Sequence, residues 1–198
     1  MNIKQALEAQ LGALPHIQLN DVEVDPASIR AVMINEVVPA DPAQDFYGAC
    51  GQEYLSTTIP LFQQAGLAIN SIDDILRMGV YITNAVKTPK TTYAIEKERI
   101  DESLPYLEAE LALFPNVQVI MLMGDVAKKM VNAIVKKTTK KNVIPSGATY
   151  KLRGNSYYFG DIRVIPSYII TGGNLLIEKS KVRMITEDIA AMVEIIRQ

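Results

Sequence analysis

The chain has 198 residues, of which 48% are hydrophobic and 21% charged. This length suffices for one sizeable core, and the composition excludes a largely disordered chain. The chain has 20 Lys and Arg and 22 Asp and Glu, which gives a net charge of -2. The overall charge therefore does not attract nucleic acid, and any DNA contact requires a local patch of positive charge. A single cysteine, Cys50, and a single histidine, His16, exclude an internal disulfide, a thiolate-held cluster and a metal site with two imidazoles. We expect neither a metal nor a cofactor.

The sequence carries no pattern typical of export or membrane insertion. The N-terminal residues lack the apolar segment of a signal peptide, and no run approaches the about 18 apolar residues of a membrane span. We therefore expect a cytoplasmic protein without a membrane partner. Residues 1–198 are expected to form one domain, with residues 1–28 as an N-terminal helical arm and His16 at the surface.

Short apolar runs alternate with segments of helical periodicity along the chain. The runs predict four buried strands, at residues 31–34, 80–83, 117–123 and 162–165. Helices are predicted at residues 2–13, 52–65, 126–135 and 180–196, the second ending at Gly66 and the third capped by Asp125. This alternation predicts an α/β fold with a parallel sheet covered on both faces, in which ligands bind beyond the carboxyl ends of the strands.

Two further segments have their own patterns. A long amphipathic stretch follows Pro89, and we expect it to kink at Pro105 or to restart there with Ser103 as its cap. Residues 149–152 and 156–159 alternate like paired strands and predict a hairpin that turns at Gly154 and Asn155.

The segments at the expected strand ends are rich in groups that can bind a nucleobase. They are Asn35-Glu36, Asp41 and Asp45 with Phe46-Tyr47-Gly48, Asn84 with Lys87, Gly124-Asp125, and Pro166-Ser167-Tyr168 with the loop 171–174. An amide can read one edge of a pyrimidine, an aromatic ring can stack on a base, and a carboxylate can orient water toward an oxocarbenium-like sugar. This combination favours cleavage of an N-glycosidic bond.

The order of these segments resembles the uracil-DNA glycosylase superfamily, most closely the branch that carries an iron–sulfur cluster. The resemblance rests on residues 34–39, 45–51, 81–87, 119–127 and 165–168. It implies a three-layer α/β/α sandwich with a four-stranded, mainly parallel sheet. It also implies excision of a damaged, deaminated base from DNA after the nucleotide is flipped out of the stack.

The resemblance also implies roles for single residues. Glu36 matches the family carboxylate beside the water-activating loop, Phe46 the stacking aromatic, and Asn84 and Lys87 the base-reading pair. Tyr47, Ser167 and Tyr168 would line the same base pocket, and Asn174 and Leu175 would contact DNA from the loop after the family's His-Pro-Ser motif. Which of Glu36, Asp41 and Asp45 faces the crevice stays open, because the first motif loop is shorter than in the family.

Two departures from the family pattern bear on activity. Ile165 stands where the family has a histidine that donates to the uracil carbonyl, and losing one such donor commonly costs about 10²–10³ in rate. The cluster cysteines are absent. The alternative is therefore a catalytically inactive protein that keeps the fold and binds a nucleobase or nucleic acid, and an α/β domain for an unrelated small ligand also stays open.

Blander interpretations exist for single residues. Asp41 and Asp45 are also typical of turn or helix-cap residues. Phe46 and Tyr47 could belong to the hydrophobic core beneath the loop. The lysines of residues 136–141 are typical of a solvent-exposed loop. The oligomeric state is not indicated by the sequence.

Overall fold

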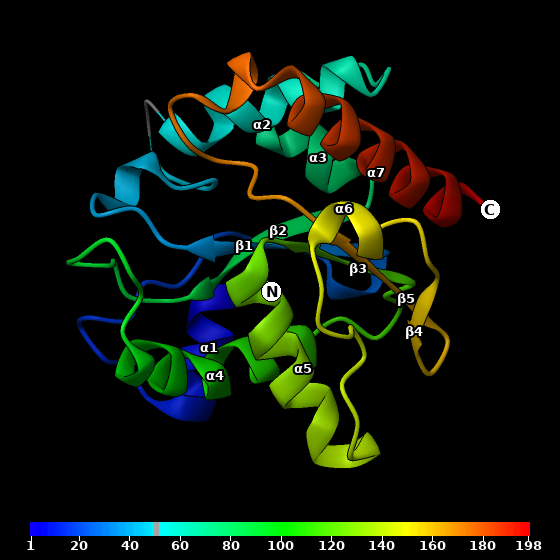
Figure 1. Ribbon diagram of the computed structural model, residues 1–198. Coiled ribbons are helices and arrows are strands. Elements are labelled where there is room, and N and C mark those ends of the chain that lie inside the picture. The colour runs from blue at the N-terminus through cyan, green and yellow to red at the C-terminus, as the bar shows by residue number, and fades with distance from the viewer. Residues whose placement is uncertain (50–51) are drawn as a thin grey trace.

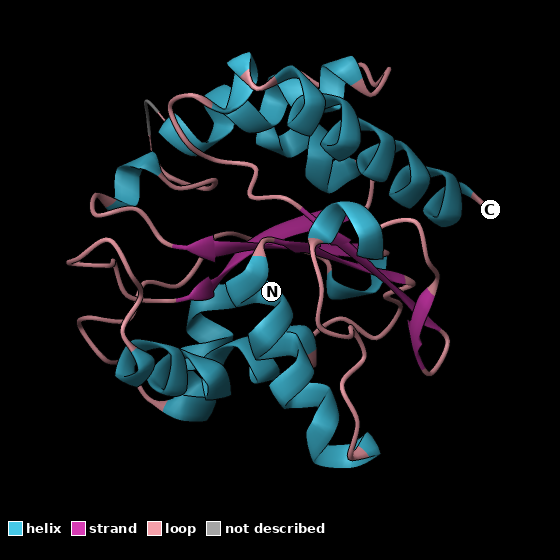
Figure 2. Ribbon diagram, viewed as in Figure 1, coloured by secondary structure: helices cyan, strands magenta, loops and turns pink. Residues whose placement is uncertain are grey.

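The computed structural model of the protein describes residues 1–49 and 52–198. Cys50 and Gly51, which the sequence assigns to one of the family-like segments, lie outside the described residues. The chain forms three layers, in which a central sheet is covered by helices on both faces (Figures 1 and 2). This confirms the predicted α/β/α sandwich.

The sheet has five strands in the order β2-β1-β3-β5-β4. The strands are β1 (Ala31–Val37), β2 (Val80–Val86), β3 (Val119–Met123), β4 (Tyr157–Phe159) and β5 (Ile162–Ser167). Strands β2, β1, β3 and β5 run parallel, and the short edge strand β4 pairs antiparallel with β5. The four predicted core strands are thus the parallel ones, and β4 falls within residues 156–159, the predicted second strand of the hairpin.

Helices cover the two faces in separate groups (Figure 1). One face carries α1 (Ile3–Leu11), α4 (Lys97–Leu111) and α5 (Asp125–Thr139). The other carries α2 (Glu53–Gln64), α3 (Ile72–Arg77) and α7 (Lys179–Arg197), and the short α6 (Thr149–Leu152) lies beside α5. Three single turns, η1 (Pro26–Ser28), η2 (Pro42–Gln44) and η3 (Leu175–Ile177), interrupt the loops.

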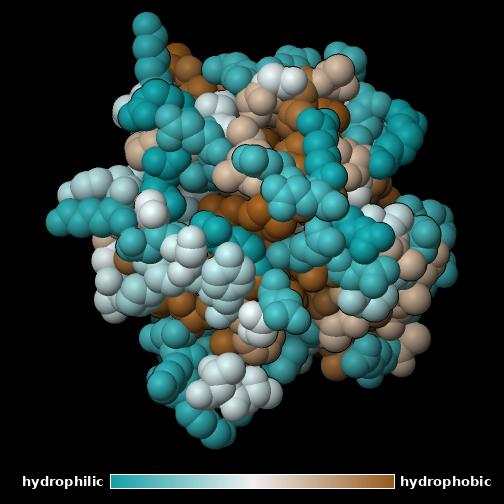
Figure 3. All heavy atoms as spheres, turned by 90° about the vertical axis from the view of Figure 1, so that its right-hand side faces the viewer, coloured by the Kyte–Doolittle hydropathy of each residue, from teal (hydrophilic) through white to brown (hydrophobic). Residues whose placement is uncertain are grey.

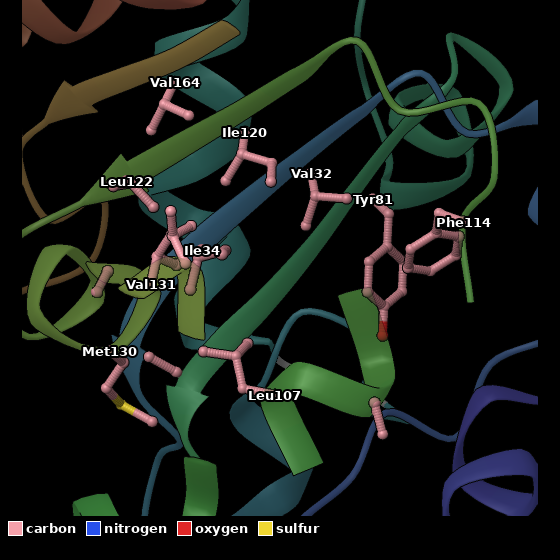
Figure 4. Close-up of a cluster of buried hydrophobic side chains, with 14 of the residues drawn as sticks. Val32, Ile34, Tyr81, Leu107, Phe114, Ile120, Leu122, Met130, Val131 and Val164 are labelled. Atoms are coloured by element: carbon pink, nitrogen blue, oxygen red, sulfur yellow. The ribbon is translucent and has the colours of Figure 1, made fainter. Parts of the chain in front are cut away.

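Successive side chains of the parallel strands point to opposite faces of the sheet, and together with the helices they form two hydrophobic cores. On the face of α1, α4 and α5, Val32, Ile34 and Tyr81 pack with Leu107 and Val131 (Figure 4). Figure 4 also shows the rings of Tyr81 and Phe114 side by side, with their centroids 4.8 Å apart. The intervening residues of the same strands form the second core with α2, α3 and α7. Because both faces are covered, the central strands read as continuous apolar runs in the sequence.

The strand order places a topological switch point between β1 and β3. From β1 the chain proceeds to β2 on one side, and then crosses back to β3 on the other side of β1. Connections that leave neighbouring strands in opposite directions open a crevice beyond the carboxyl ends of those strands. The fold therefore favours a binding site next to residues 35–37 and 124–126.

The predicted hairpin is wrong in its first strand. Residues 149–152 form α6, and β4 pairs instead with β5 across a turn at Gly160 and Asp161. Gly160 has a φ of 57°, a left-handed conformation that tight hairpin turns require and that glycine adopts without strain. The hairpin therefore turns at residues 160–161 and not at Gly154 and Asn155, where the sequence predicted it.

Two predicted helix caps are also wrong. Helix α4 runs through Pro105 without restarting, so the restart is wrong and the kink at Pro105 stays a prediction. The Ser103 hydroxyl accepts a hydrogen bond from the backbone N–H of Lys87 (2.9 Å) instead of capping a helix. Helix α5 begins at Asp125, whose side chain makes no capping hydrogen bond; that role belongs to Glu36 from β1.

The outer surface has an ordinary mixture of residues. On the side that carries β4 and the C-terminus, hydrophobic residues reach the surface between hydrophilic ones (Figure 3). Among the helices of the described residues, none has the length and apolar character needed to cross a bilayer.

Gly48 offers a test of how tightly the segment before α2 is folded. A Cβ atom on Gly48 would lie 2.0 Å from the carbonyl oxygen of Ala43, so Gly48→Ala forces two backbone segments apart. We expect a loss of about 1–3 kcal/mol in the free energy of unfolding, measured by urea denaturation. The control is Gly154→Ala, where the nearest atom to the new Cβ is 4.0 Å away. Equal stability of both variants would contradict this packing.

Candidate functional site

A pocket of about 870 Å³ lies where the switch point predicts it. Glu36 from β1, Gly124 and Asp125 from the start of α5, and Tyr168 and Thr171 from the loop after β5 line it. Tyr93, Ile169, residues 147–150 at the start of α6, and residues of the segment 172–181 complete the wall. We call this cavity the Glu36 pocket.

Glu36 is held against the N-terminal turn of α5. Its Oε1 accepts a hydrogen bond from the backbone N–H of Val126 (3.2 Å), at the helix end where free N–H groups and the helix dipole favour an anion. A Cβ on Gly124 would lie 2.6 Å from the same oxygen, so only glycine allows this approach. Burial is the main cause that raises the pKa of Glu36, and the negative charge of Asp125 adds to it, while the Val126 hydrogen bond acts against both. A partly desolvated carboxylate in a cleft is typical of functional sites.

The other two candidate carboxylates lie outside this pocket. Asp41 is exposed and caps η2, where its side chain accepts a hydrogen bond from the N–H of Ala43. Asp45 is buried and lines a smaller cavity of about 240 Å³ beside the N-terminal arm. Of the three carboxylates that the sequence left open, Glu36 is therefore the one in the large pocket.

A chain of hydrogen bonds leads from Asp45 to the wall of the Glu36 pocket. The Asn84 amide donates to both Asp45 oxygens (2.9 and 3.0 Å), and its own oxygen accepts from the amide of Asn35 (3.1 Å). Asn35 also donates to the hydroxyl of Thr171 (3.3 Å), which lines the pocket. The Asn35 side-chain oxygen is buried and has no partner among the described residues.

Sequence reasoning gave Asn35 no role of its own. The signal that could have found it is its position directly opposite Asn84 in the sheet, since the two residues are register partners in β1 and β2. Asn35 and Asn84 also lie inside their strands rather than after them, because both strands extend about three residues beyond the predicted runs.

Phe46 and Tyr47 are packed in the interior of this structure. Phe46 is 0% exposed, and its ring lies 5.3 Å from that of Tyr54. The Tyr47 hydroxyl accepts the N–H of Ile82 (3.0 Å), and its ring stacks on Tyr81. Both side chains thus occupy the core positions that the sequence allowed as an alternative, and a base could stack on Phe46 only after the surrounding residues move.

Lys87 lies on the opposite face of the sheet from Phe46. Its ammonium group donates to Glu110 (2.5 Å) and to the hydroxyl of Thr83 (2.8 Å), and both charged side chains are almost fully buried. The Tyr81 hydroxyl donates to the same Glu110 carboxylate (2.6 Å). Lys87 therefore belongs to a buried polar cluster that the sequence did not indicate, because Glu110 lies 23 residues further along the chain, in α4.

Some side chains at the end of β5 and in the segment after it lie in the core, and others line the Glu36 pocket. The Ser167 hydroxyl is buried and donates to Asp188 of α7 (2.7 Å), which also pairs with Arg153 (2.9 Å). Tyr168 and Asn174 line the Glu36 pocket. Leu175 lines it too but is only 6% exposed, and Ile165, at 3%, belongs to the core beneath α7.

The fold and this pocket together define an α/β sandwich with a polar site over a switch point. The sequence model of the uracil DNA glycosylase superfamily matches residues 41–169, well over half of the chain. The chain therefore belongs to that superfamily. The matched region includes Asp45, Phe46 and Asn84 and begins after Glu36. A comparison with curated proteins found no significant match.

The buried ion pair gives a prediction about stability. Replacing Lys87 with Met leaves the Glu110 charge buried without its partner, which costs about 3–5 kcal/mol of unfolding free energy. The matched control is Lys137→Met, which breaks the exposed pair with Glu108 and should cost at most about 1 kcal/mol. Urea denaturation measures both variants, and equal losses would show that the Lys87 pair is not isolated from solvent.

Asp45 gives a prediction about pH. Burial raises the pKa of Asp45 above its usual 3.8, although the N–H of Phe46 and the amide of Asn84 act against this. A carboxyl whose pKa rises on folding stabilises the folded state most at low pH, and this contribution is lost as the pH rises through the folded pKa. The stability of the wild type relative to Asp45→Asn should therefore fall as the pH rises from about 3.8 through the folded pKa. If the unfolding free energy of the wild type instead rose relative to that of Asp45→Asn as the pH increased, the burial of this carboxyl would be contradicted.

Proposed function

We propose that this protein hydrolyses the N-glycosidic bond of a damaged, deaminated base in DNA, and that the reacting nucleotide occupies the Glu36 pocket. The observation that carries the proposal is the position of Glu36. A half-buried carboxylate is fixed at a helix N-terminus in the pocket over the switch point of a glycosylase-superfamily fold.

The Glu36 carboxylate would act on the sugar and on water. As the bond between C1′ and the base breaks, positive charge develops on the sugar, and a nearby carboxylate stabilises it. Glu36 would also accept a hydrogen bond from the attacking water, orient its oxygen toward C1′ and take up the proton that the water loses as the new C–O bond forms. That proton then returns through solvent to the departed base, which leaves as an anion. The bonding electrons leave with the base, so negative charge grows on the base carbonyl oxygens.

Donors are then needed at the departing base, because Ile165 supplies none. Tyr168, Thr171 and Asn174 line the same pocket, and their hydroxyl and amide groups would donate hydrogen bonds to base carbonyls. Deamination replaces an exocyclic amino group with a carbonyl, so a wall of donors favours a deaminated base. Asn84 would be a positioning residue, acting through Asn35 on the Thr171 hydroxyl.

A second candidate is a nucleobase-binding or nucleic-acid-binding protein without catalysis. It is favoured by Ile165 in the place of the family histidine, and by the closed packing around Phe46 and Asn84, which are 0% and 1% exposed. The two candidates differ in whether Glu36 is needed for turnover or only for the shape of the pocket.

Base excision tests the proposal. Labelled oligonucleotides with uracil, hypoxanthine or xanthine are incubated with the protein, and abasic sites are cleaved and counted. We expect Glu36→Gln to lower the excision rate at least about a hundredfold, because glutamine keeps the acceptor for the Val126 N–H and removes the charge. The matched control, Asp41→Asn, removes an exposed carboxylate outside the pocket and should leave the rate unchanged.

The pH profile gives a second readout on Glu36. Since the ionised form would be active and burial raises its pKa, the rate should rise with pH through a value above the usual 4.5. Absence of excision of all three bases by the folded wild type, or equal rates for wild type and Glu36→Gln, would contradict the proposal.

A further inference from the structure

A basic groove adjoins the Glu36 pocket along the exposed side of α5. It has a volume of about 510 Å³ and lies between α5 and the loop 142–147. Asp125 and Gly147 line both the groove and the Glu36 pocket, so the two cavities are neighbours. We call it the α5 groove.

The charge of the α5 groove differs from that of the Glu36 pocket. Lys128, Lys129 and Lys136 line the groove, and Asp125 is the acidic residue among its lining residues. Lys128 already neutralises Asp125 in a salt bridge of 2.7 Å. Lys129 and Lys136 are exposed and form no salt bridge in the described part of the chain, so their charges are available to a ligand.

The two available lysines have a spacing suited to an extended anionic chain. They are seven residues apart on one helix, which places them on the same side and about 10.5 Å apart along the axis. Extended along the groove, the two ammonium groups can contact separate phosphates of one strand. The spacing therefore favours a polyanion over a free phosphate.

The opposite wall of the groove is fixed to the helix. Asn132 accepts hydrogen bonds from the N–H groups of Val143 and Ile144 (2.9 and 3.0 Å) and donates to the carbonyl of Ile144 (2.9 Å). These three bonds hold the loop at a constant distance from α5. The shape of the groove is therefore fixed by hydrogen bonds between the loop and the helix.

An aromatic side chain stands where the Glu36 pocket opens next to Gly147. Tyr150 lines the pocket and is 59% exposed, and the Lys151 ammonium lies 5.6 Å from the centre of its ring. An exposed tyrosine next to a lysine can stack on an unpaired base while the lysine contacts a phosphate. This arrangement suits a single strand that passes from one cavity to the other.

We propose that the α5 groove binds the phosphate backbone of the nucleic-acid strand whose reacting nucleotide occupies the Glu36 pocket. The inference rests on the proposed function, since it assigns a nucleotide to that pocket. The acidic pocket then faces the sugar, where positive charge develops, and the basic groove faces the phosphates. The groove thereby supplies the local positive patch that a near-neutral chain needs in order to bind a strand.

Salt-dependent binding tests this inference independently of catalysis. A fluorescent single-stranded oligonucleotide with one uracil is titrated with wild type and with the double variant Lys129→Gln/Lys136→Gln, and anisotropy gives the affinity. For single strands, each phosphate contact contributes about 0.7 to the slope of log affinity against log salt. We expect the double variant to reduce the slope by about 1.4 and to weaken binding about tenfold at about 0.2 M salt.

The matched control is Lys141→Gln/Arg197→Gln, which removes the same charge from exposed positions outside the groove and should bind like the wild type. An oligonucleotide without uracil should show the same loss, because phosphate contacts do not read bases. Unchanged binding of the groove variant, an equal loss in the control, or no binding by the wild type would overturn the inference. Groove-dependent binding without excision would support it while contradicting the proposed hydrolysis.

Discussion

The contact between the Glu36 carboxylate and the first turn of α5 connects the fold to the site. Glu36 ends an otherwise buried run of β1, and the hydrogen bond from Val126 keeps its carboxylate at the helix N-terminus instead of in solvent. The approach requires the missing Cβ of Gly124, and it requires β1 and β3 to be neighbours in the sheet. The Glu36 pocket, its half-buried carboxylate and the groove along α5 all depend on where this helix begins.

Much of the fold could be predicted because its signals are local. Continuous apolar runs marked the parallel strands, and helical periodicity marked α5 and α7. The predicted hairpin failed because residues 149–152 fit a strand or a helix about equally well, and pairing with β5 was decided by the turn at Gly160. The cap of α5 could not be read locally, because the capping carboxylate lies 90 residues away in the sequence.

The sequence indicated which residues lie near the candidate site, but it did not indicate the partners that several of them contact. Glu36, Tyr168 and Asn174 do line one pocket, whereas Lys87 and Ser167 point to buried partners on α4 and α7. Those partners, Glu110 and Asp188, sit in helices that the sequence marks only as amphipathic. Asn35 gained importance through its register with Asn84, which becomes visible only when the two strands are paired.

We propose that groups on the pocket wall read the base, and that the buried pair Phe46 and Asn84 has a supporting role. A crystal structure of Glu36→Gln with a uracil-containing oligonucleotide tests this most directly. We predict the base beside Tyr168 and Thr171, its sugar next to residue 36, and Asn84 still bonded to Asp45. A base stacked on Phe46 and bonded to the Asn84 amide, with the Asp45 contact broken, would contradict the account.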